Sequence, residues 1–125
     1  MKKILILGSG SFAGSSLTNY LLNKKYFVFG TNRRLKKNDY FLPYKKNIYF
    51  KNFKSVIFEI NSAKDQRKIL KIIKKHKIKI IIDFLGQGMV SQSWEAPQDW
   101  LKTNILSKSN LIENLVKNKI IIKKY

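Results

Sequence analysis

A cluster of glycines close to the N-terminus carries the residues best suited to bind a phosphate. The apolar run Ile4–Leu7 is followed by Gly8-Ser-Gly-Ser-Phe-Ala-Gly14 and then by a helical pattern. This order predicts a strand, a tight turn and a helix, and the first N–H groups of such a helix lack partners and lie at the positive end of its dipole. We expect Gly8 to allow the turn, Gly10 to leave room for a pyrophosphate, and Ala13 or Gly14 to let the helix pack closely on the strand.

The glycines fit two related sequence patterns. Gly8, Gly10 and Ala13 match G-x-G-x-x-G/A, whereas Gly8, Ser11 and Gly14 match G-x-x-G-x-x-G with a serine in the middle position. Such patterns also occur in ordinary turns, but the place of this one between a strand and a helix favours dinucleotide binding. The candidate phosphate-binding residues are Gly8, Ser9, Gly10, Ser11, Phe12, Ala13 and Gly14.

The segment Thr31–Arg34 lies where dinucleotide-binding proteins distinguish their cofactors. An acidic residue about 20 residues beyond the glycine turn would bond the ribose 2′-hydroxyl of NAD. This chain instead has Asn32, Arg33 and Arg34, which include two of its three arginines. A guanidinium holds a 2′-phosphate in a fork, whereas a carboxylate would repel it. The position therefore predicts NADP as the cofactor, with NAD and an ordinary basic loop as the alternatives.

Two later segments are expected at the same edge of the sheet. Glu59 and Ile60 end the run Ser55–Ile60, where they would border an adenine. A second apolar run, Ile78–Phe84, leads into a short glycine loop that a doubly wound sheet places beside the first glycine turn, in the crevice where ligands bind. The candidate residues of this loop are Phe84, Leu85, Gly86 and Gln87.

The composition excludes several kinds of site. The chain has 125 residues and 44% hydrophobic content, which suits one domain, residues 1–125, with its own core. It has no cysteine, so it cannot form disulfides, cysteine metal sites or a thiol nucleophile, and its one histidine, His76, cannot build a zinc site alone. No apolar run approaches the about 18 residues of a membrane span, and no signal peptide opens the chain. We expect a soluble cytoplasmic protein without a metal site or a membrane partner.

The net charge of +19 raises the question of nucleic-acid binding. Lysines outnumber arginines 23 to 3 and are scattered along the whole chain. Nucleic-acid sites rely on arginine for bidentate contacts with phosphate and guanine. We therefore expect no specific nucleic-acid partner, only weak non-specific adhesion.

Hydrophobic patterns predict the elements that would position the candidate residues. The expected strands are Ile4–Leu7, Tyr26–Gly30, Ser55–Ile60 and Ile78–Phe84. Helices are expected at about 11–23 and 98–118, and between them a helix that is capped by Asn61 or Ser62 and runs to about Lys77. The residues expected to face the sheet are Ala13, Leu17, Tyr20 and Leu21 in the first helix and Leu101, Ile105, Leu111, Ile112 and Leu115 in the last. Residues 35–54 show no period, and we expect them to form a solvated surface loop.

This alternation of strands and helices predicts an α/β fold of the Rossmann type. Right-handed crossovers between the strands give a parallel sheet with the strand order 3-2-1-4. A fifth strand would begin within Ile120–Tyr125. We therefore expect an incomplete sheet, with strand five onward missing.

Four segments together resemble the extended short-chain dehydrogenases/reductases, the NAD(P)-dependent nucleotide-sugar epimerases and dehydratases. The turn Gly8–Gly14 is similar to their T-G-x-x-G-F-I-G motif, and Asp83–Pro97 is similar to their N-L-A-A-Q-S-H-V-x-x-S-F-E-x-P segment. Gly30–Arg34 resembles the end of strand two in the NADP-using GDP-mannose 4,6-dehydratase branch, and Phe58–Asn61 resembles the segment that flanks adenine. Asn104 lies where the family has an asparagine in the next helix.

The resemblance implies a role for each group of candidate residues. It implies that the pyrophosphate contacts Gly8, Ser11, Phe12, Ala13 and Gly14. It implies that Arg33 and Arg34 hold the 2′-phosphate and that Glu59 and Ile60 border the adenine. The wall beside the ribose and pyrophosphate would be formed by Phe84, Leu85, Gly86 and Gln87. The chain departs from the family where Ser11 replaces a glycine, Leu85 and Gly86 replace paired alanines, and Met89 replaces a histidine.

The catalytic residues of the family lie outside the resemblance. Family catalysis uses a Ser or Thr after strand five and a Tyr-x-x-x-Lys motif on the next helix, and no such motif follows Asn104 in this chain. The resemblance implies the N-terminal part of a longer enzyme, without catalytic residues of its own. The full-length form would bind a nucleotide-sugar substrate and form a homodimer. The alternatives are a non-catalytic dinucleotide-sensing module and a basic nucleic-acid-binding protein.

Overall fold

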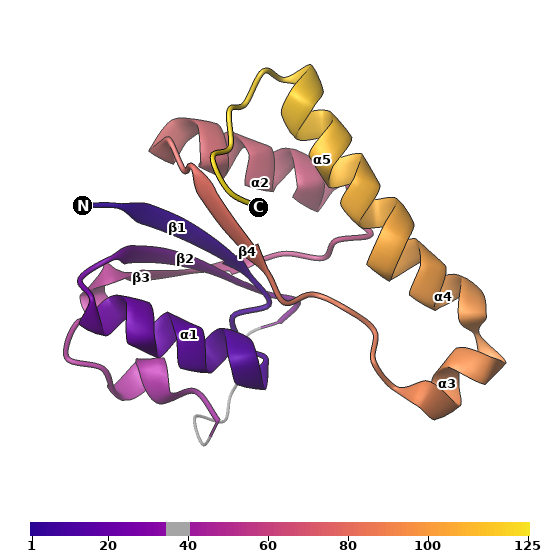
Figure 1. Cartoon of the computed structure of the whole chain (residues 1–125), viewed down its shortest axis with the longest axis horizontal. Coiled ribbons are helices and arrows are strands. Elements are labelled where there is room, and N and C mark those ends of the chain that lie inside the picture. The colour runs from indigo at the N-terminus through magenta and orange to yellow at the C-terminus, as the bar shows by residue number, and fades with distance from the viewer. Residues whose placement is uncertain (35–40) are drawn as a thin grey trace.

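The computed structural model describes residues 1–34 and 41–125. Four strands form one parallel sheet in the order β3-β2-β1-β4, which confirms the predicted order. The strands are β1 (Lys3–Leu7), β2 (Phe27–Asn32), β3 (Phe53–Ile57) and β4 (Ile80–Asp83). Helix α1 (Phe12–Asn23) covers one face, and α2 (Ala63–His76) and α5 (Ser107–Lys117) cover the other (Figure 1).

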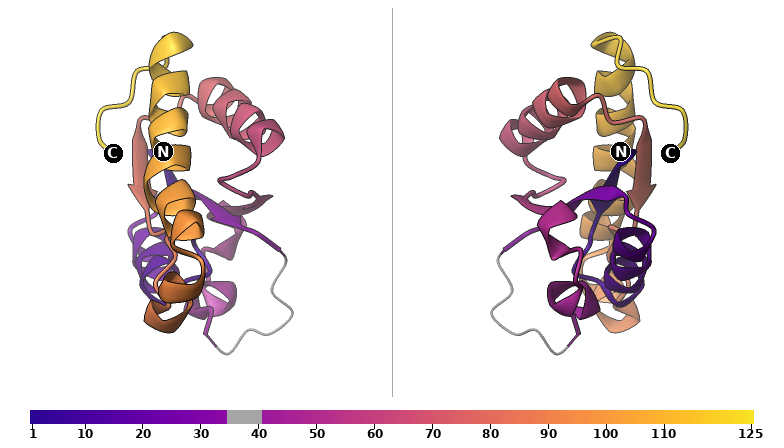
Figure 2. Two further views of the ribbon diagram at one scale, coloured as in Figure 1. Left: turned by 90° about the vertical axis from the view of Figure 1, so that its right-hand side faces the viewer. Right: turned by 90° about the vertical axis from the view of Figure 1, so that its left-hand side faces the viewer.

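The central strand β1 divides the core into two layers. Leu5 and Leu7 pack with residues of α2 and α5, whereas Ile4 and Ile6 pack with residues of α1. Each of these four side chains is at most 3% exposed. A parallel strand that is covered on both faces needs an unbroken apolar run, and this explains the composition of the N-terminal strand. The two side views show α2 and α5 side by side on their face of the sheet (Figure 2).

Helix α1 faces the sheet with two of the four residues predicted, because Leu21 is buried and Leu17 is partly buried in the same core layer. The prediction that Ala13 and Tyr20 face the sheet is wrong, because Ala13 is exposed and Tyr20 is 56% exposed. The close contact is made by Gly14, since a Cβ atom built on it would lie 2.2 Å from the Gly8 carbonyl oxygen. The residues of α1 that are buried together with Gly14 are Ser15, Thr18, Leu21 and Leu22.

The predicted surface loop at 35–54 is wrong for the part that the structure describes, residues 41–54. Two 3-10 helices, η1 (Pro43–Lys46) and η2 (Phe50–Asn52), occur there. Leu42 and Tyr44 are each 2% exposed and pack in the α1 layer of the core. The Asn47 amide donates to the side-chain oxygen of Asn19 at 2.6 Å. Aromatic side chains therefore make this segment part of the core, while residues 35–40 of the predicted loop lie outside the described residues.

The predicted last helix, 98–118, is confirmed as a continuous helical segment from Pro97 to Lys117. It consists of α4 (Pro97–Leu101), a π-helical stretch, η3 (Lys102–Leu106), and α5, and a short helix, α3 (Val90–Glu95), precedes it. Leu111 and Leu115 are buried, as predicted, whereas Leu101, Ile105 and Ile112 are 58%, 59% and 45% exposed. A π-turn changes the helical phase, so Leu101 and Ile105 do not lie on the face that buries Leu111 and Leu115.

The final residues lie along the outer edge of β4. Lys124 forms a single parallel bridge with Ile80, and its carbonyl oxygen accepts a hydrogen bond from the Ile81 N–H at 3.0 Å. This is the place where we expected a fifth strand to begin. Within the described ranges, 1–34 and 41–125, no helix has the length and apolar character needed to cross a membrane.

Candidate functional site

The glycine turn between β1 and α1 is fixed to the end of β2. Gly8 has φ +80°, a left-handed conformation that favours glycine. Its N–H donates to the Thr31 hydroxyl at 3.0 Å, and the Ser9 N–H donates to the Thr31 carbonyl at 3.0 Å. Gly8 therefore makes the sharp turn that its position predicted, and Thr31, which sequence reasoning missed, holds that turn in place.

Ser11 caps helix α1. Its hydroxyl accepts a hydrogen bond from the Gly14 N–H at 3.0 Å, and its φ of −72° is an ordinary conformation for a serine. A serine therefore occupies this position of the turn without backbone strain. The cap was not predicted, although a serine three residues before a free helical N–H is a typical cap signal.

The next two N–H groups of α1 are available to a ligand. Within the part of the chain that the structure describes, no hydrogen bond satisfies the N–H of Phe12 or of Ala13. Both side chains are exposed, with Phe12 at 85%, so water or a ligand can reach this end of the helix. A helix N-terminus with free N–H groups binds anions.

A cavity of about 240 Å³ lies beside this turn, at the carboxyl ends of the strands. It brings together residues of all four segments singled out in the sequence. The lining residues are Gly8, Gly10, Ser11, Arg33, Phe58, Glu59, Ile60, Asn61, Phe84, Leu85, Gly86, Gln87 and Thr103.

Other candidate residues do not line the cavity. Ser9 is fully buried, and its hydroxyl accepts a hydrogen bond from the Asn32 amide at 3.2 Å. Gly14 is buried against Gly8, and Arg34 is exposed beyond the end of β2. The structure thus separates Arg33, at the cavity, from its neighbour Arg34.

Glu59 and Ile60 follow β3 instead of ending it. The strand begins and ends earlier than predicted, at Phe53 and Ile57, so Glu59 occupies the turn before α2. Its N–H donates to the Asp65 carboxylate at 2.9 Å. This bond, together with the ion pair to Lys68 at 3.2 Å, lowers the pKa of Asp65 from its ordinary value. Asp65 therefore fixes the backbone where it borders the cavity.

The opposite wall is held by Asn104 from the π-helical stretch. Its side-chain oxygen accepts from the Gln87 N–H at 2.8 Å, and its amide donates to the Gln87 carbonyl at 3.1 Å. At the base of the same loop, Asp83 accepts from the Leu85 N–H at 2.7 Å and forms an ion pair with Lys108 at 3.1 Å. The loop after β4 is therefore fixed at both ends.

Tyr125 also contacts Asp83. Its hydroxyl lies 3.2 Å from the carboxylate, and burial, followed by the charge and hydrogen bond of Asp83, raises the pKa of Tyr125 above its usual range.

Another tyrosine, Tyr20, has the spacing Tyr-x-x-x-Lys with Lys24, but it is exposed on α1 and neither residue lines the cavity. The Lys24 ammonium lies 5.6 Å from the centre of the Tyr20 ring. This pair is therefore not placed to act on a ligand of the cavity.

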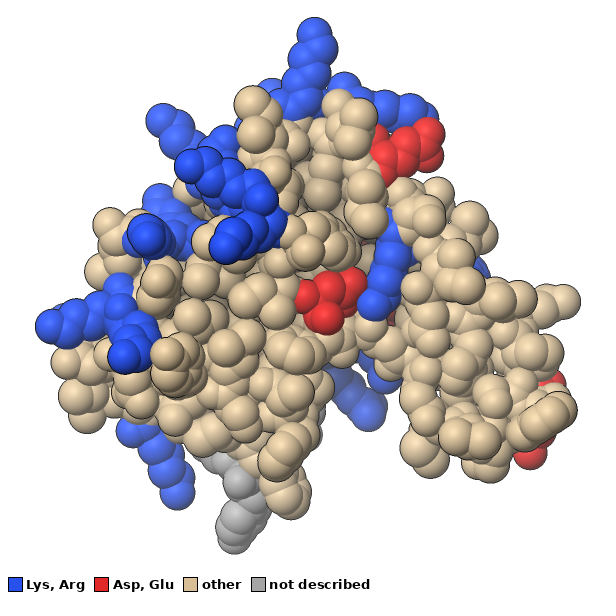
Figure 3. All heavy atoms as spheres, in the orientation of Figure 1, with Lys and Arg blue, Asp and Glu red and all other residues tan. Residues whose placement is uncertain are grey.

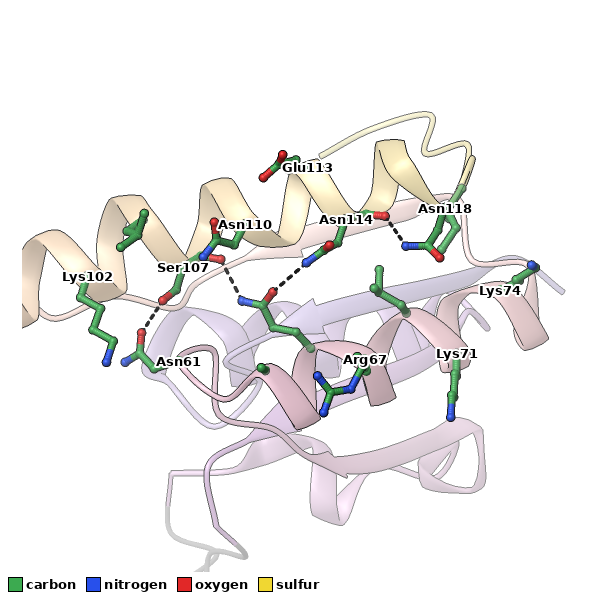
Figure 4. Close-up of a pocket in the computed structure, with 15 residues that line it drawn as sticks. Asn61, Arg67, Lys71, Lys74, Lys102, Ser107, Asn110, Glu113, Asn114 and Asn118 are labelled. Carbon is green, nitrogen blue, oxygen red and sulfur yellow. Dashed lines mark hydrogen bonds between the residues drawn. The ribbon is translucent and has the colours of Figure 1, made fainter.

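A larger groove of about 750 Å³ separates α2 from α5 (Figure 4). Gln66 crosses it and donates to the carbonyl oxygens of Ile60 at 2.8 Å and Ser107 at 3.0 Å. Asn114 donates to the Gln66 side-chain oxygen at 3.5 Å. These amides join the two helices.

Comparison with known proteins identifies the family. The family model described as GDP-mannose 4,6 dehydratase matches residues 5–124. The protein CapI of Staphylococcus aureus is 26% identical over 113 residues, which are 89% of this chain and 33% of that protein. The UDP-glucose 4-epimerase of Mus musculus is 26% identical over 116 residues, which are 90% of this chain and 33% of the relative. The chain spans about a third of the length of these curated relatives.

Solved structures share the fold. A UDP-glucose 4-epimerase from Stenotrophomonas maltophila with bound NAD and formylated UDP-arabinopyranose has a TM-score of 0.78 at 16% identity, over 96% of this chain and 35% of that one. ElxO with NADP bound has a TM-score of 0.71 at 21% identity, over 94% of this chain and 50% of that one. The family model covers nearly the whole sequence, and the chain belongs to the GDP-mannose 4,6-dehydratase family of extended short-chain dehydrogenases/reductases.

Proposed function

We propose that this chain is the NADP-binding portion of a nucleotide-sugar 4,6-dehydratase or epimerase. The observation that carries the proposal is the cavity at the carboxyl ends of the strands. There the glycine turn, Arg33, the segment Glu59–Ile60 and the loop Phe84–Gln87 meet. In open α/β sheets, ligands bind in this crevice.

The residues present fit a dinucleotide. Gly14 allows α1 to approach the turn so closely that a Cβ atom there would lie 2.2 Å from a backbone oxygen. The free N–H groups of Phe12 and Ala13 would donate to the pyrophosphate, which the helix dipole also attracts. The guanidinium of Arg33 would hold the 2′-phosphate from the wall of the cavity.

When bound, the nicotinamide would accept a hydride from the sugar and later return it. The chain's own residues would bind and orient the cofactor, and the hydrogen bonds between Asn104 and Gln87 would hold the loop after β4 as one wall of its site. We assign no proton transfer to this chain, because its Tyr20–Lys24 pair lies away from the cavity. We therefore expect the 125 residues to bind NADP without turning over a nucleotide sugar.

A second candidate is a non-catalytic module that senses the NADP state. The observation that favours it is the position of Tyr20 and Lys24, which have the spacing Tyr-x-x-x-Lys but lie away from the cavity. The coding sequence downstream of Tyr125 separates the two candidates. A frame that encodes such a motif supports the enzyme, and a stop without any remnant of it supports the module. In the enzyme, the nucleotide-sugar site and a homodimer would belong to the full-length form.

Replacing Arg33 tests the assignment of the cofactor. Arg33→Ala should weaken NADP binding by about 10- to 100-fold, because it removes a charge-assisted hydrogen bond to the 2′-phosphate, and it should leave NAD binding unchanged. Isothermal titration calorimetry with both cofactors measures the two effects.

Two matched variants serve as controls for this test. Arg34→Ala should have a smaller effect, since Arg34 does not line the cavity. Arg67→Ala removes the third arginine, which lies on α2 at the other groove, and should affect neither cofactor. An equal loss of NADP and NAD binding in Arg33→Ala would contradict the assignment, and failure of the wild-type chain to bind either dinucleotide would overturn the proposed function.

A further inference from the structure

A second cavity lies at the opposite end of the sheet from the candidate dinucleotide site. It has a volume of about 650 Å³ and is bounded by the start of β1, the C-terminal end of α2, the segment that enters β4 and the last residues of the chain. The lining residues are Met1, Lys2, Lys3, Lys75, His76, Lys77, Lys79, Ile80 and Lys123. The amino ends of the strands, where the cavity lies, take no part in the proposed cofactor site.

Six of the nine lining residues are lysines, whereas lysine makes up 23 of the 125 residues of the chain. The local density of positive charge therefore exceeds what the lysine-rich composition alone would produce. Among the described residues, no carboxylate lines the cavity and none forms an ion pair with any of the six lysines. In the space-filling view, which draws Lys and Arg in one colour, basic side chains gather at the same end of the molecule, near the start of β1 and the end of α2 (Figure 3).

The backbone arranges these lysines from three directions. Lys77 ends α2 in a left-handed conformation, φ 54°, and the chain then turns into β4. Lys75 and Lys79 lie on either side of this turn, and Lys3 comes from the neighbouring strand β1. Lys123 comes from the final segment, where its N–H donates to the Lys79 carbonyl at 2.8 Å. The charges thus converge from separate elements on one concave surface.

We propose that this cavity binds a small anion carrying several phosphate groups. Unpaired lysines that surround a cavity repel one another in the folded protein, and a multiply charged anion would relieve that repulsion. An ammonium binds phosphate as a point charge, without the planar fork by which arginine recognises flat groups, and no arginine lines this cavity. The concave shape favours a compact ligand over an extended polymer. The site is independent of the proposed cofactor site.

His76 provides a built-in reporter of occupancy. It is the only histidine of the chain, so it gives a single imidazole signal in NMR spectra. Its ring packs on Phe29 from β2, with 4.7 Å between ring centres. Burial, and then the charges of Lys3 on β1, Lys54 on β3 and Lys75 on α2, lower the pKa of His76 from its ordinary value. An anion in the cavity would offset those charges and raise the pKa again.

The test uses tripolyphosphate as the probe, at about 0.15 M salt to screen diffuse attraction. Calorimetry should give saturable one-site binding, and the pKa of His76 should rise in the saturated sample. One triple variant removes half of the lining lysines through Lys3→Gln, Lys75→Gln and Lys79→Gln. It should bind tripolyphosphate at least about tenfold more weakly than the wild-type chain does. The matched control removes the same number of exposed charges elsewhere, through Lys46→Gln, Lys51→Gln and Lys64→Gln. It should retain the wild-type affinity for tripolyphosphate.

Three results would overturn the proposal. Equal weakening in the two triple variants would show diffuse adhesion to a chain of net charge +19. Binding without any change in the pKa of His76 would place the anion elsewhere. Tighter binding of a single-stranded oligonucleotide than of tripolyphosphate, at equal phosphate concentration and salt, would indicate a nucleic-acid surface. Both triple variants change exposed side chains only, and circular dichroism checks that they keep the wild-type fold.

Discussion

At the scale of single residues, Gly14 decides how closely α1 approaches the glycine turn. Gly14→Ala would place a Cβ atom 2.2 Å from the Gly8 carbonyl oxygen and 2.8 Å from the Ser11 hydroxyl. Both neighbours belong to the turn, so the helix must move away from it. We expect the free energy of unfolding to fall by about 2–4 kcal/mol and dinucleotide binding to be lost.

Thermal unfolding and calorimetry check the effect of Gly14→Ala. The matched control is Gly88→Ala, because a Cβ atom on Gly88 meets no atom within 4 Å. That variant should change stability by no more than about 0.5 kcal/mol. Equal stability of the two variants would show that the close approach of α1 is not needed.

The sequence predicted the turn correctly but left Ala13 and Gly14 as alternatives for the close contact. Strand, turn and helix are local features, and a glycine at a sharp turn has a strong local signal. Which residue of the helix touches the turn depends on how the helix is rotated on the sheet. That rotation is set by the packing of Leu21 and Leu22 against core residues of β2 and η1, which come later in the chain. The local pattern therefore could not choose between the two residues.

His76 should make the stability of the protein depend on pH. Its pKa is lowered in the folded state, first by burial and then by Lys3, Lys54 and Lys75. The unfolded state, with the ordinary pKa of 6.5, therefore binds the proton more readily, and stability falls as the pH drops below about 6.5. Urea unfolding between about pH 5 and pH 8 measures this slope, and His76→Gln should flatten it. An unchanged slope in that variant would exclude His76 as its source.

At the scale of elements, one buried amide joins α2 to α5. Gln66 is 6% exposed and donates to two carbonyl oxygens, one before α2 and one in α5. Gln66→Ala leaves both oxygens without this donor, and we expect it to cost about 2–3 kcal/mol of stability. Lys71→Ala, at an exposed position of the same helix, should cost less than about 0.5 kcal/mol. Chemical denaturation compares the two variants, and similar midpoints would contradict the role of Gln66.

The element pattern fixed the strand order but not every packing contact. Alternating strands and helices allow few arrangements once crossovers are right-handed, so the order 3-2-1-4 followed from the sequence. Residues 41–54 were not predicted to be buried because they have no helical or strand period. Their packing depends on contacts between aromatic rings, such as Tyr44 and Phe53, whose ring centres lie 4.6 Å apart. Such contacts depend on how the rings fit together in space and leave no regular spacing in the sequence.

At the scale of the whole molecule, charge and exposed apolar surface act against each other. Leu101, Ile105, Ile112 and Val116 are between 45% and 71% exposed on the helices that follow β4. A net charge of +19 keeps chains apart by repulsion. Salt screens that repulsion, so we expect the 125-residue chain to be marginally stable and to aggregate more readily as salt is raised.

Static light scattering across a salt series measures the onset of this aggregation. Ile105→Gln should move the onset to higher salt, because it interrupts the exposed apolar residues near the centre of the helical segment. Ile48→Gln is the matched control, since Ile48 is 83% exposed and lies in the segment between η1 and η2. The same onset in both variants would mean that aggregation does not use the surface of η3 around Ile105.

The hydrogen bonds of Thr31 have a consequence for how this chain can change over evolutionary time. They tie the end of β2 to the glycine turn, and the exposed side chains of Arg33 and Arg34 follow directly after this tied segment. Substitution of either arginine leaves those bonds intact. Under the proposed function, a lineage could therefore exchange one cofactor for the other through substitutions that do not lower the stability of the fold. Selection would remove changes at Thr31 in every lineage, both in those that use NADP and in those that use NAD.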